Sequence, residues 1–161
     1  VSASDISREA LWVAAVNARR LLPPRGIRLY RSDLLARVPG RYDLITANPP
    51  YLTDGEVENM QKIGWPEPAL ALRGGVDGTD FLRRLIRQAL RKLRRGGYLL
   101  LDSAHDHPVP LDQRFALEFR RDDNGLEMAA ISNDLDISAR HAGLDKIHDR
   151  LCFHNSLQCF R

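Results

Sequence analysis

The sequence is short of cysteine, of aromatic residues and of long apolar stretches. Its two cysteines, Cys152 and Cys159, are too few for a disulfide framework and fit a reducing compartment, so we expect a cytoplasmic protein. No apolar run approaches the roughly 20 residues that a membrane-spanning helix needs, and we therefore expect no membrane partner. These absences argue against a disulfide-stabilised secreted domain and against a membrane protein.

Charge of one sign is not in large excess either. The 161 residues contain 24 Lys and Arg against 21 Asp and Glu, which leaves a net charge of +3. With 43% hydrophobic and 28% charged residues, the composition is that of a globular domain and excludes a disordered tail or a coiled coil. The length suits a single domain over residues 1–161, and the mild basic excess permits a nucleic-acid partner without requiring one.

Strand and helix patterns alternate through residue 102. Helical periodicity begins after Ser7, a good N-cap, and again at Thr79 or Asp80, where the second helix runs to Gly96 and Gly97. Segments with the composition of strands precede or follow these helices, at residues 1–6, 27–30, 41–47 and 98–102. The alternation predicts an α/β fold with a doubly wound parallel sheet.

The rest of the chain has a different character. Residues 51–77 lack periodicity and are rich in proline and glycine, so we expect a long functional loop there. Residues 113–120 and 127–132 predict two strands of a β-hairpin, because Asn124 and Gly125 between them form a turn signal. We therefore divide the domain into an α/β core of residues 1–102 and a β-hairpin with a C-terminal segment over residues 103–161.

Polar signals follow three of the predicted strands. Asp5 ends the first strand, Asp33 follows the second, and Asn48 follows the third. Ligands of doubly wound sheets bind outside the carboxyl ends of the strands, where one carboxylate can accept both hydroxyls of a ribose and another can accept from an adenine amino group. For each aspartate taken alone, a helix cap or a turn is the favoured interpretation.

The third signal, Asn48, Pro49, Pro50 and Tyr51, is more specific. Two consecutive prolines lack N–H groups and fix φ, so the backbone there is rigid and presents carbonyl oxygens without competing donors. The Asn48 side-chain carbonyl and the Pro49 carbonyl together suit an NH2 group conjugated to a π system, with Tyr51 packing on the planar group. Such a site orients the nitrogen for methyl transfer without a strong base. The alternative is a plain proline-rich turn.

These motifs, in this order, resemble those of the HemK-type protein-(glutamine-N5) methyltransferases, known as release factor glutamine methyltransferases. The resemblance covers residues 1–101 and implies a Rossmann-like class I S-adenosylmethionine-dependent methyltransferase. Beyond the Asn-Pro-Pro-Tyr sequence, which adenine N6-methyltransferases share, it depends on a series that looks specific to the glutamine branch, namely Glu67-Pro68, Ala71-Leu72, Gly74-Gly75 and Asp77-Gly78.

The resemblance implies a role for each site residue. Asp5 would bind the ribose of S-adenosylmethionine and Ile6 would pack on the adenine, beside Asp33 and Leu34. The catalytic group would be the turn of Asn48, Pro49, Pro50 and Tyr51, in which Asn48 and Pro49 hold the substrate amide, Tyr51 packs beside it, and Asn48 also borders the cofactor.

The implied substrate is a glutamine side chain in a translation protein, either a peptide-chain release factor or a ribosomal protein. The implied mechanism is direct transfer without a metal. Two alternatives stay open. One is a nucleic-acid adenine N6-methyltransferase, and the other is a truncated, non-catalytic relative that keeps the fold as an interaction module.

One family feature is not found in the sequence. Family members begin the cofactor site with a strand and an acidic, glycine-rich loop upstream of the segment that corresponds to residues 1–6. We expect that without these elements the chain holds the cofactor poorly and is part of a longer enzyme. We also expect the neighbouring strands to be unpaired and apolar helix surface to be exposed.

Three other clusters have ordinary interpretations. The arginines and lysine between Arg83 and Arg95 predict a solvated basic helix face, with RNA contact as the alternative. The remaining clusters have no usual metal-ligand spacing, and we expect no metal at either. They comprise Asp102, His105, Asp106 and His107 in the first, and His148, Cys152, His154 and Cys159 in the second.

Overall fold

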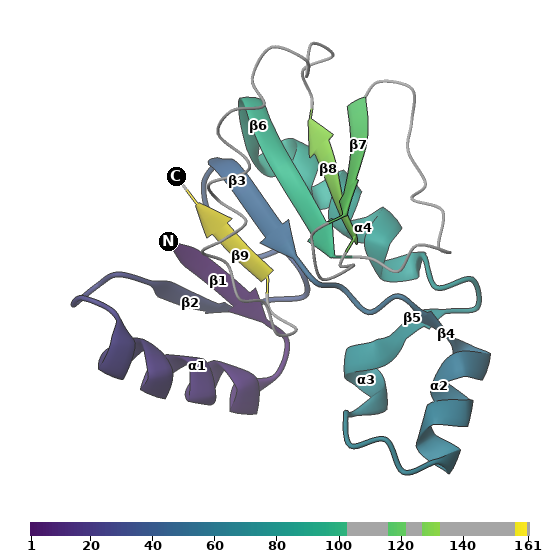
Figure 1. The fold of residues 1–161 in the computed structure, drawn as a ribbon. Helices are drawn as coiled ribbons and strands as arrows, with labels where there is room; N and C mark the ends of the chain where they lie inside the picture. Colours follow the sequence, from purple (N-terminus) through teal and green to yellow (C-terminus); the bar gives the residue numbers. More distant parts are fainter. Residues whose placement is uncertain (103–115, 122–126, 133–156, 161) are drawn as a thin grey trace.

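The computed structural model describes residues 1–102, 116–121, 127–132 and 157–160. Its main element is a seven-stranded sheet with strand order β2-β1-β9-β3-β6-β8-β7 (Figure 1). A two-stranded sheet, β4-β5, lies apart from it with two helices. Every helix in the described part of the chain is too short or too polar to cross a membrane.

The first strand, helix and strand form one edge of the sheet. β1 (Ser2–Asp5) and β2 (Arg28–Arg31) pair in parallel, with α1 (Arg8–Leu21) between them in sequence. Ser7 is the N-cap of α1, and its hydroxyl oxygen accepts a hydrogen bond from the Ala10 N–H at 3.1 Å. This capping bond satisfies one of the backbone donors that a helix start leaves unpaired.

The core lies between β3 (Tyr42–Ala47), β6 (Leu93–Asp102) and α4 (Asp80–Lys92). β3 and β6 pair in parallel, and α4 buries Leu82, Leu85, Ile86 and Ala89 in the same cluster. Leu99, Leu100 and Leu101 are all at most 5% exposed. Because neighbouring residues of a strand point to opposite sides, β6 is covered on both faces, as its apolar sequence predicts.

The predicted hairpin strands are present. β7 (Ala116–Arg121) pairs antiparallel with β8 (Glu127–Ser132), and β8 pairs antiparallel with β6. The predicted turn at Asn124 and Gly125 lies outside the described residues. The hairpin therefore extends the far edge of the main sheet.

β9 (Leu157–Phe160) changes the predicted sheet in one respect. It runs antiparallel between β1 and β3, so these strands are paired and the sheet is mixed rather than wholly parallel (Figure 1). The expectation that they would be unpaired was wrong, because the C-terminal segment supplies extended backbone that bonds to both. The expected exposure of apolar helix surface is confirmed: α1 has no buried residue, and Trp12 is 69% exposed.

The expectation of an irregular loop over residues 51–77 was also wrong. This segment contains β4 (Leu52–Thr53), α2 (Asp54–Lys62), α3 (Ala69–Leu72) and β5 (Arg73–Gly75). α2 begins with a capping box, in which the Thr53 hydroxyl oxygen accepts from the Glu56 N–H and the Glu56 carboxylate accepts from the Thr53 N–H. The spacing Thr53-x-x-Glu56 was the signal for this helix.

Glycine is required where β5 meets α4. A Cβ on Gly74 would lie 2.5 Å from the Gly78 carbonyl oxygen, and Gly75 has a φ of 101°. Both positions exclude an ordinary side chain, one by close approach and the other by its left-handed backbone. The pair thus lets the small sheet turn tightly into the long helix.

The helix α4 ends earlier than the glycines that follow it predict. α4 ends at Lys92, and Leu93 already has an extended backbone and pairs with Tyr42 in the main sheet. Leu93 is 2% exposed, so burial of its side chain accompanies the early change from helix to strand. Gly96 and Gly97 lie within β6 instead of at the helix end.

Candidate functional site

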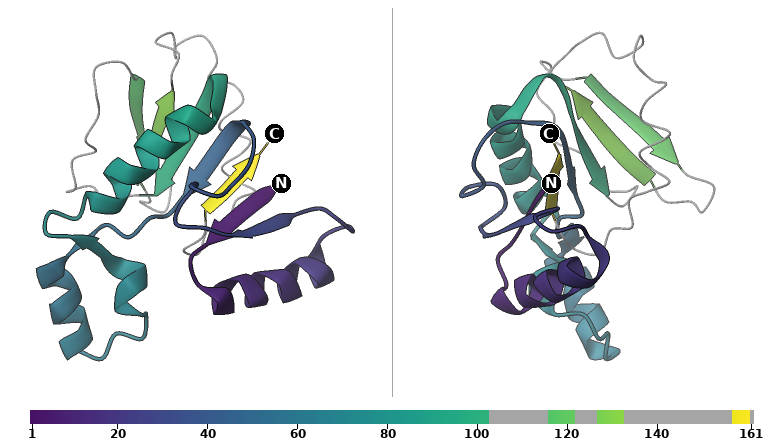
Figure 2. Two further views of the ribbon diagram at one scale, coloured as in Figure 1. Left: turned by 180° about the vertical axis from the view of Figure 1, so that it is seen from behind. Right: turned by 90° about the vertical axis from the view of Figure 1, so that its left-hand side faces the viewer.

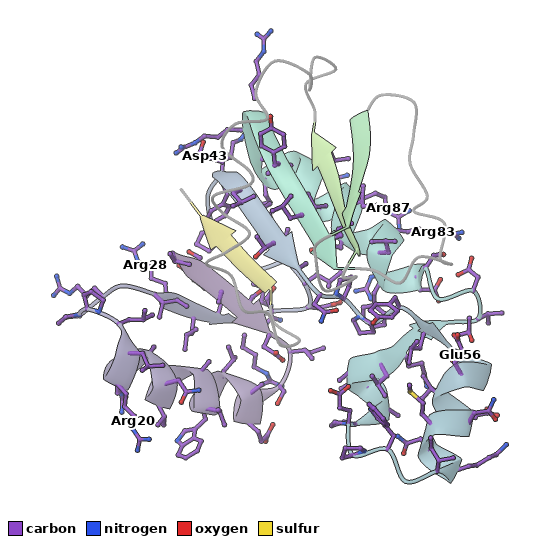
Figure 3. All side chains as sticks on the ribbon, in the orientation of Figure 1. Arg20, Arg28, Asp43, Glu56, Arg83 and Arg87 are labelled. Atoms are coloured by element: carbon purple, nitrogen blue, oxygen red, sulfur yellow. The ribbon has the colours of Figure 1, made fainter. Side chains whose placement is uncertain are left out.

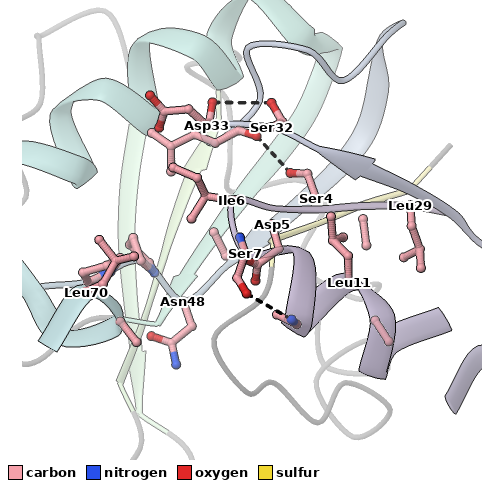
Figure 4. Close-up of a pocket in the computed structure, with 18 of the residues that line it drawn as sticks. Ser4, Asp5, Ile6, Ser7, Leu11, Leu29, Ser32, Asp33, Asn48 and Leu70 are labelled. Carbon is pink, nitrogen blue, oxygen red and sulfur yellow. Dashed lines mark hydrogen bonds between the residues drawn. The ribbon is translucent and has the colours of Figure 1, made fainter. Parts of the chain in front are cut away.

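A pocket of about 660 Å³ lies where β1, β2 and β3 end (Figure 4). It brings together residues from all three strand ends that the sequence singled out. From the predicted site they are Asp5, Ile6, Asp33, Leu34, Asn48, Pro49 and Pro50. Tyr51 is the one predicted site residue that is not among those lining the pocket.

The end of β1 forms one side of the pocket. The Asp5 carboxylate accepts a hydrogen bond through Oδ1 from the Ser7 N–H at 2.7 Å, so the aspartate is tied to the start of α1. This bond occupies one carboxylate oxygen and leaves Oδ2 to accept from a ligand. Ile6 is 51% exposed and presents apolar surface beside it.

The turn after β2 forms the second side. Leu34 has a φ of 50°, an unusual conformation for a residue with a side chain, and its carbonyl accepts from the Ser4 hydroxyl at 2.9 Å. The Ser32 hydroxyl oxygen accepts from the Arg37 N–H at 2.9 Å. These bonds hold the turn so that Asp33 and Leu34 border the pocket (Figure 4).

The end of β3 forms the third side. Ala47 and Pro49 are buried, whereas Asn48 is half-buried and lines the pocket. Pro49 and Pro50 have no N–H to donate, so the backbone at these two positions contributes only acceptors. The Asn48 amide adds a side-chain carbonyl to the same side of the pocket (Figure 4).

Residues that the strand-end argument did not identify complete the fourth side. Pro68, Leu70 and Ala71 come from the segment around α3, and Phe81 and Leu85 come from α4. Pro68 and Ala71 belong to the series that carries the family resemblance. Leu70 and Phe81 had no comparable signal, because an apolar residue in a sequence does not show which cavity it borders.

The electrostatic character of the pocket is simple. Among the described residues that line it, Asp5 and Asp33 are the only ionisable side chains, set in mostly apolar walls. Outside the lining residues, at the start of α1, hydrogen bonds from its own backbone N–H and from the Ser7 hydroxyl lower the pKa of Glu9. A flat, largely apolar molecule with hydroxyl and amino donors suits this arrangement, and a nucleoside has those properties.

The described residues contain no group of three or more His, Cys, Asp or Glu side chains that could hold a metal ion. The side chains of both clusters that we considered for metal binding lie outside the residues whose side chains are described. The structure therefore leaves that prediction untested.

Sequence comparison finds curated relatives over about two thirds of the chain. The chain is 38% identical over 109 residues to a ribosomal protein uL3 glutamine methyltransferase of Neisseria meningitidis, a match that covers 68% of this chain and 36% of the relative. It is 38% identical over 102 residues to a release factor glutamine methyltransferase of Borreliella burgdorferi, covering 63% and 35%. The chain thus spans about a third of the length of these relatives. A comparison with models of protein families finds none that matches the chain.

Comparison with solved structures addresses the fold. A methyltransferase from Pyrococcus furiosus superposes with a TM-score of 0.57 at 18% identity, covering 81% of this chain and 60% of that one. TrmN from Thermus thermophilus superposes with a TM-score of 0.55 at 22% identity, covering 81% and 35%. These matches confirm the predicted Rossmann-like class I methyltransferase fold.

Proposed function

We infer that the chain is the catalytic part of an S-adenosylmethionine-dependent N-methyltransferase. The inference rests on its relation to the HemK-type protein-(glutamine-N5) methyltransferases, which its motifs predicted. The observation that supports this most is the convergence of Asp5, Asp33 and Asn48 on one pocket. A carboxylate for a ribose, a carboxylate for an adenine and an amide carbonyl for the acceptor are the groups that this reaction needs.

The pocket's own residues fit the adenosine part of the cofactor. Asp5 would accept from the ribose hydroxyls through Oδ2, and Asp33 would accept from the adenine amino group. Ile6 and Leu34 would pack on the faces of the purine. When bound, S-adenosylmethionine supplies a methyl group on a positively charged sulfur, which makes the carbon electrophilic.

The acceptor is held by the turn after β3. The Asn48 side-chain carbonyl and the Pro49 backbone carbonyl would accept from the two hydrogens of the substrate amide, and Pro50 keeps the turn rigid. Held in this way, the amide nitrogen would be oriented to accept a methyl group, and its proton would pass to water after the transfer, so no strong base would be needed. We assign Tyr51, which directly follows this turn, to packing on the amide from outside the pocket.

The substrate that we propose is a glutamine in a translation protein, a peptide-chain release factor first and a ribosomal protein second. Relatives of both names match the chain at similar identity. We propose the cytoplasm as the compartment of the reaction, since translation proteins are its proposed substrates. The same turn could hold an adenine amino group, in which case the base would be unpaired or extracted from its stack, and assays with RNA and DNA test this alternative.

The test is the substitution Asn48→Ala, assayed by transfer of labelled methyl groups to a release factor, to a ribosomal protein and to RNA and DNA. We expect transfer to the protein substrates to fall by about 100-fold or more, because the amide loses one of its two acceptors. Titration with S-adenosylhomocysteine should show affinity within a few fold of the original protein.

Asn59→Ala is the matched control, since Asn59 is exposed on α2 and does not line the pocket. It should leave transfer unchanged. Unchanged turnover in Asn48→Ala would contradict the role of Asn48. Transfer to nucleic acid alone would favour the adenine N6-methyltransferase. Absence of both binding and transfer in a protein that also carries an upstream strand and glycine-rich loop would favour a non-catalytic relative.

A further inference from the structure

One face of α4 holds the turn between β2 and β3. Residues 84, 88 and 92 are four apart, so they lie on the same side of the helix. The Arg84 guanidinium donates to the Asp33 carboxylate, the Gln88 side-chain carbonyl accepts from the Leu35 N–H at 2.7 Å, and the Lys92 ammonium donates to the Val38 carbonyl. Asp33 is the ionisable residue of this turn that lines the pocket.

The ion pair between Arg84 and Asp33 contributes little to stability. The two side chains are 40% and 45% exposed, and pairs in such surroundings are largely screened by water. A bond between Nη2 and Oδ2 nevertheless fixes the rotation of the carboxylate. What the contact supplies at this place is therefore orientation of a pocket residue.

The same guanidinium also lies against a second pocket residue. Its central carbon is 5.4 Å from the centroid of the Phe81 ring, within the range of a cation–π interaction. Phe81 lines the pocket as Asp33 does. The Arg84 guanidinium thus contacts both the Phe81 ring and the Asp33 carboxylate, which form what we call the rim of the pocket. Arg84 itself is not among the lining residues.

The chemistry of the Asp33 carboxylate determines which purine substituent is favoured beside it. An ionised carboxylate only accepts hydrogen bonds, and with Oδ2 bonded to Arg84, Oδ1 is the oxygen left to accept from a ligand. An amino group on a purine satisfies that acceptor. An oxo group at the same position of the purine would place its oxygen against the carboxylate oxygen. Because both atoms only accept hydrogen bonds, binding of that purine is disfavoured.

We propose that Arg84 is a positioning residue that fixes Asp33 and Phe81 at the rim of the pocket and thereby sets its preference for an amino-purine over an oxo-purine. The proposal rests on the proposed function, because it takes this pocket as the site of the cofactor's adenosine part. Gln88 and Lys92 bond to the backbone of the turn, while Arg84 bonds to the Asp33 side chain, which would accept a hydrogen bond from the purine.

The experiment titrates the protein with adenosine and with inosine, which differ in the amino and oxo groups at one ring position. We expect about tenfold tighter binding of adenosine, the value of a hydrogen bond to a charged group at a partly exposed site. In Arg84→Met this preference should fall to within about twofold, while both nucleosides still bind. Arg84→Lys keeps the charge without the planar guanidinium and should give an intermediate preference.

Arg83→Met is the matched control, because Arg83 is the neighbouring residue of α4 and pairs with Asp77 at 3.0 Å, away from the pocket. It should retain the full preference for adenosine, with a melting temperature similar to that of Arg84→Met. If Arg84→Met does not fold, the Arg84→Lys variant decides the question by the same ratio of affinities.

The outcomes separate this inference from the proposed function. An unchanged or increased preference for adenosine in Arg84→Met would overturn the positioning role, while methyl transfer by the unsubstituted protein would leave the proposed function intact. If the unsubstituted protein bound neither nucleoside, both the adenosine site and the inference from it would fall.

Discussion

The two long helices, α1 and α4, are similar in sequence pattern and different in burial. They have 14 and 13 residues, and each has an acidic residue in its first turn and two cations in its last turn. α4 buries four side chains against the sheet, whereas α1 buries none. Figure 2 shows α4 along one face of the main sheet and α1 at the edge formed by β2.

The difference in burial between α1 and α4 indicates how much of a helix's packing its apolar stripe can predict. On α4 the stripe meets β3 and β6, and its labelled arginines, Arg83 and Arg87, lie on the outside (Figure 3). On α1 part of the stripe, including Leu11 and Ala14, lines the pocket, while Trp12 and Leu21 stay 69% and 78% exposed. Periodicity therefore predicts a helix and its apolar side, but not the surface that covers that side.

The largest expected effect comes from truncating the buried side of α4. Leu82 is 1% exposed and belongs to the core cluster, so Leu82→Ala leaves a cavity and should lower the free energy of unfolding by about 2–5 kcal/mol. Chemical denaturation measures this value. A loss below about 1 kcal/mol would mean that α4 is not packed on the sheet as described.

A smaller effect is expected at the start of α1. Ser7→Ala removes the capping acceptor of the Ala10 N–H and should cost about 1 kcal/mol. Ser7→Asp keeps an acceptor at this position and should restore most of the loss, as judged by thermal unfolding. If the aspartate variant were as unstable as the alanine variant, the cap would not be the cause.

The exposed side of α1 should tolerate change. Trp12→Ser should alter the free energy of unfolding by no more than about 0.5 kcal/mol, because the ring is already largely in water. Binding of a hydrophobic dye should decrease at the same time. A loss of about 2 kcal/mol or more would show that Trp12 is covered in the folded protein, and the contrast between the helices would disappear.

The smallest effect concerns the carboxylate before α4. Hydrogen bonds from the Thr79 hydroxyl and then from its N–H lower the pKa of Asp77, with Arg83 adding to the shift. A lowered pKa gives stability that is present above the ordinary value of about 3.9 and is lost as the pH falls through the lowered one.

Asp77→Asn should therefore lower the melting temperature slightly at neutral pH, and the difference from the original protein should shrink toward pH 3. Melting curves at several pH values test this. A difference independent of pH would trace the effect to packing or to the neutral hydrogen bonds instead of to the charge.

Much of the site could be predicted because of one geometrical fact. Parallel strands present their carboxyl ends on the same side of a sheet, so Asp5, Asp33 and Asn48 could be expected together from strand order alone. Their roles toward a cofactor and an acceptor stay predictions. The capping box at Thr53 shows that a signal was present for α2 and was obscured by the prolines and glycines that follow it.

Other features have no local signal. The bond between Arg84 and Asp33 joins residues 51 apart, and a helix rich in arginine gives no indication which of its cations has a partner. The position of β9 is a second case, because the spacing of residues within a strand specifies its faces but not its neighbours. Such features depend on the whole fold and need the structure.

β9 also has a consequence for the order in which the molecule can assemble. It is the only described strand that joins the β2-β1 pair to the β3-β6-β8-β7 group, and it follows the other described strands in the chain. On a ribosome, both groups can form early but cannot be united until residues 157–160 have emerged from the exit tunnel. Closure of the sheet should therefore be a late step that requires contacts between distant parts of the chain, which is typical of slow folding.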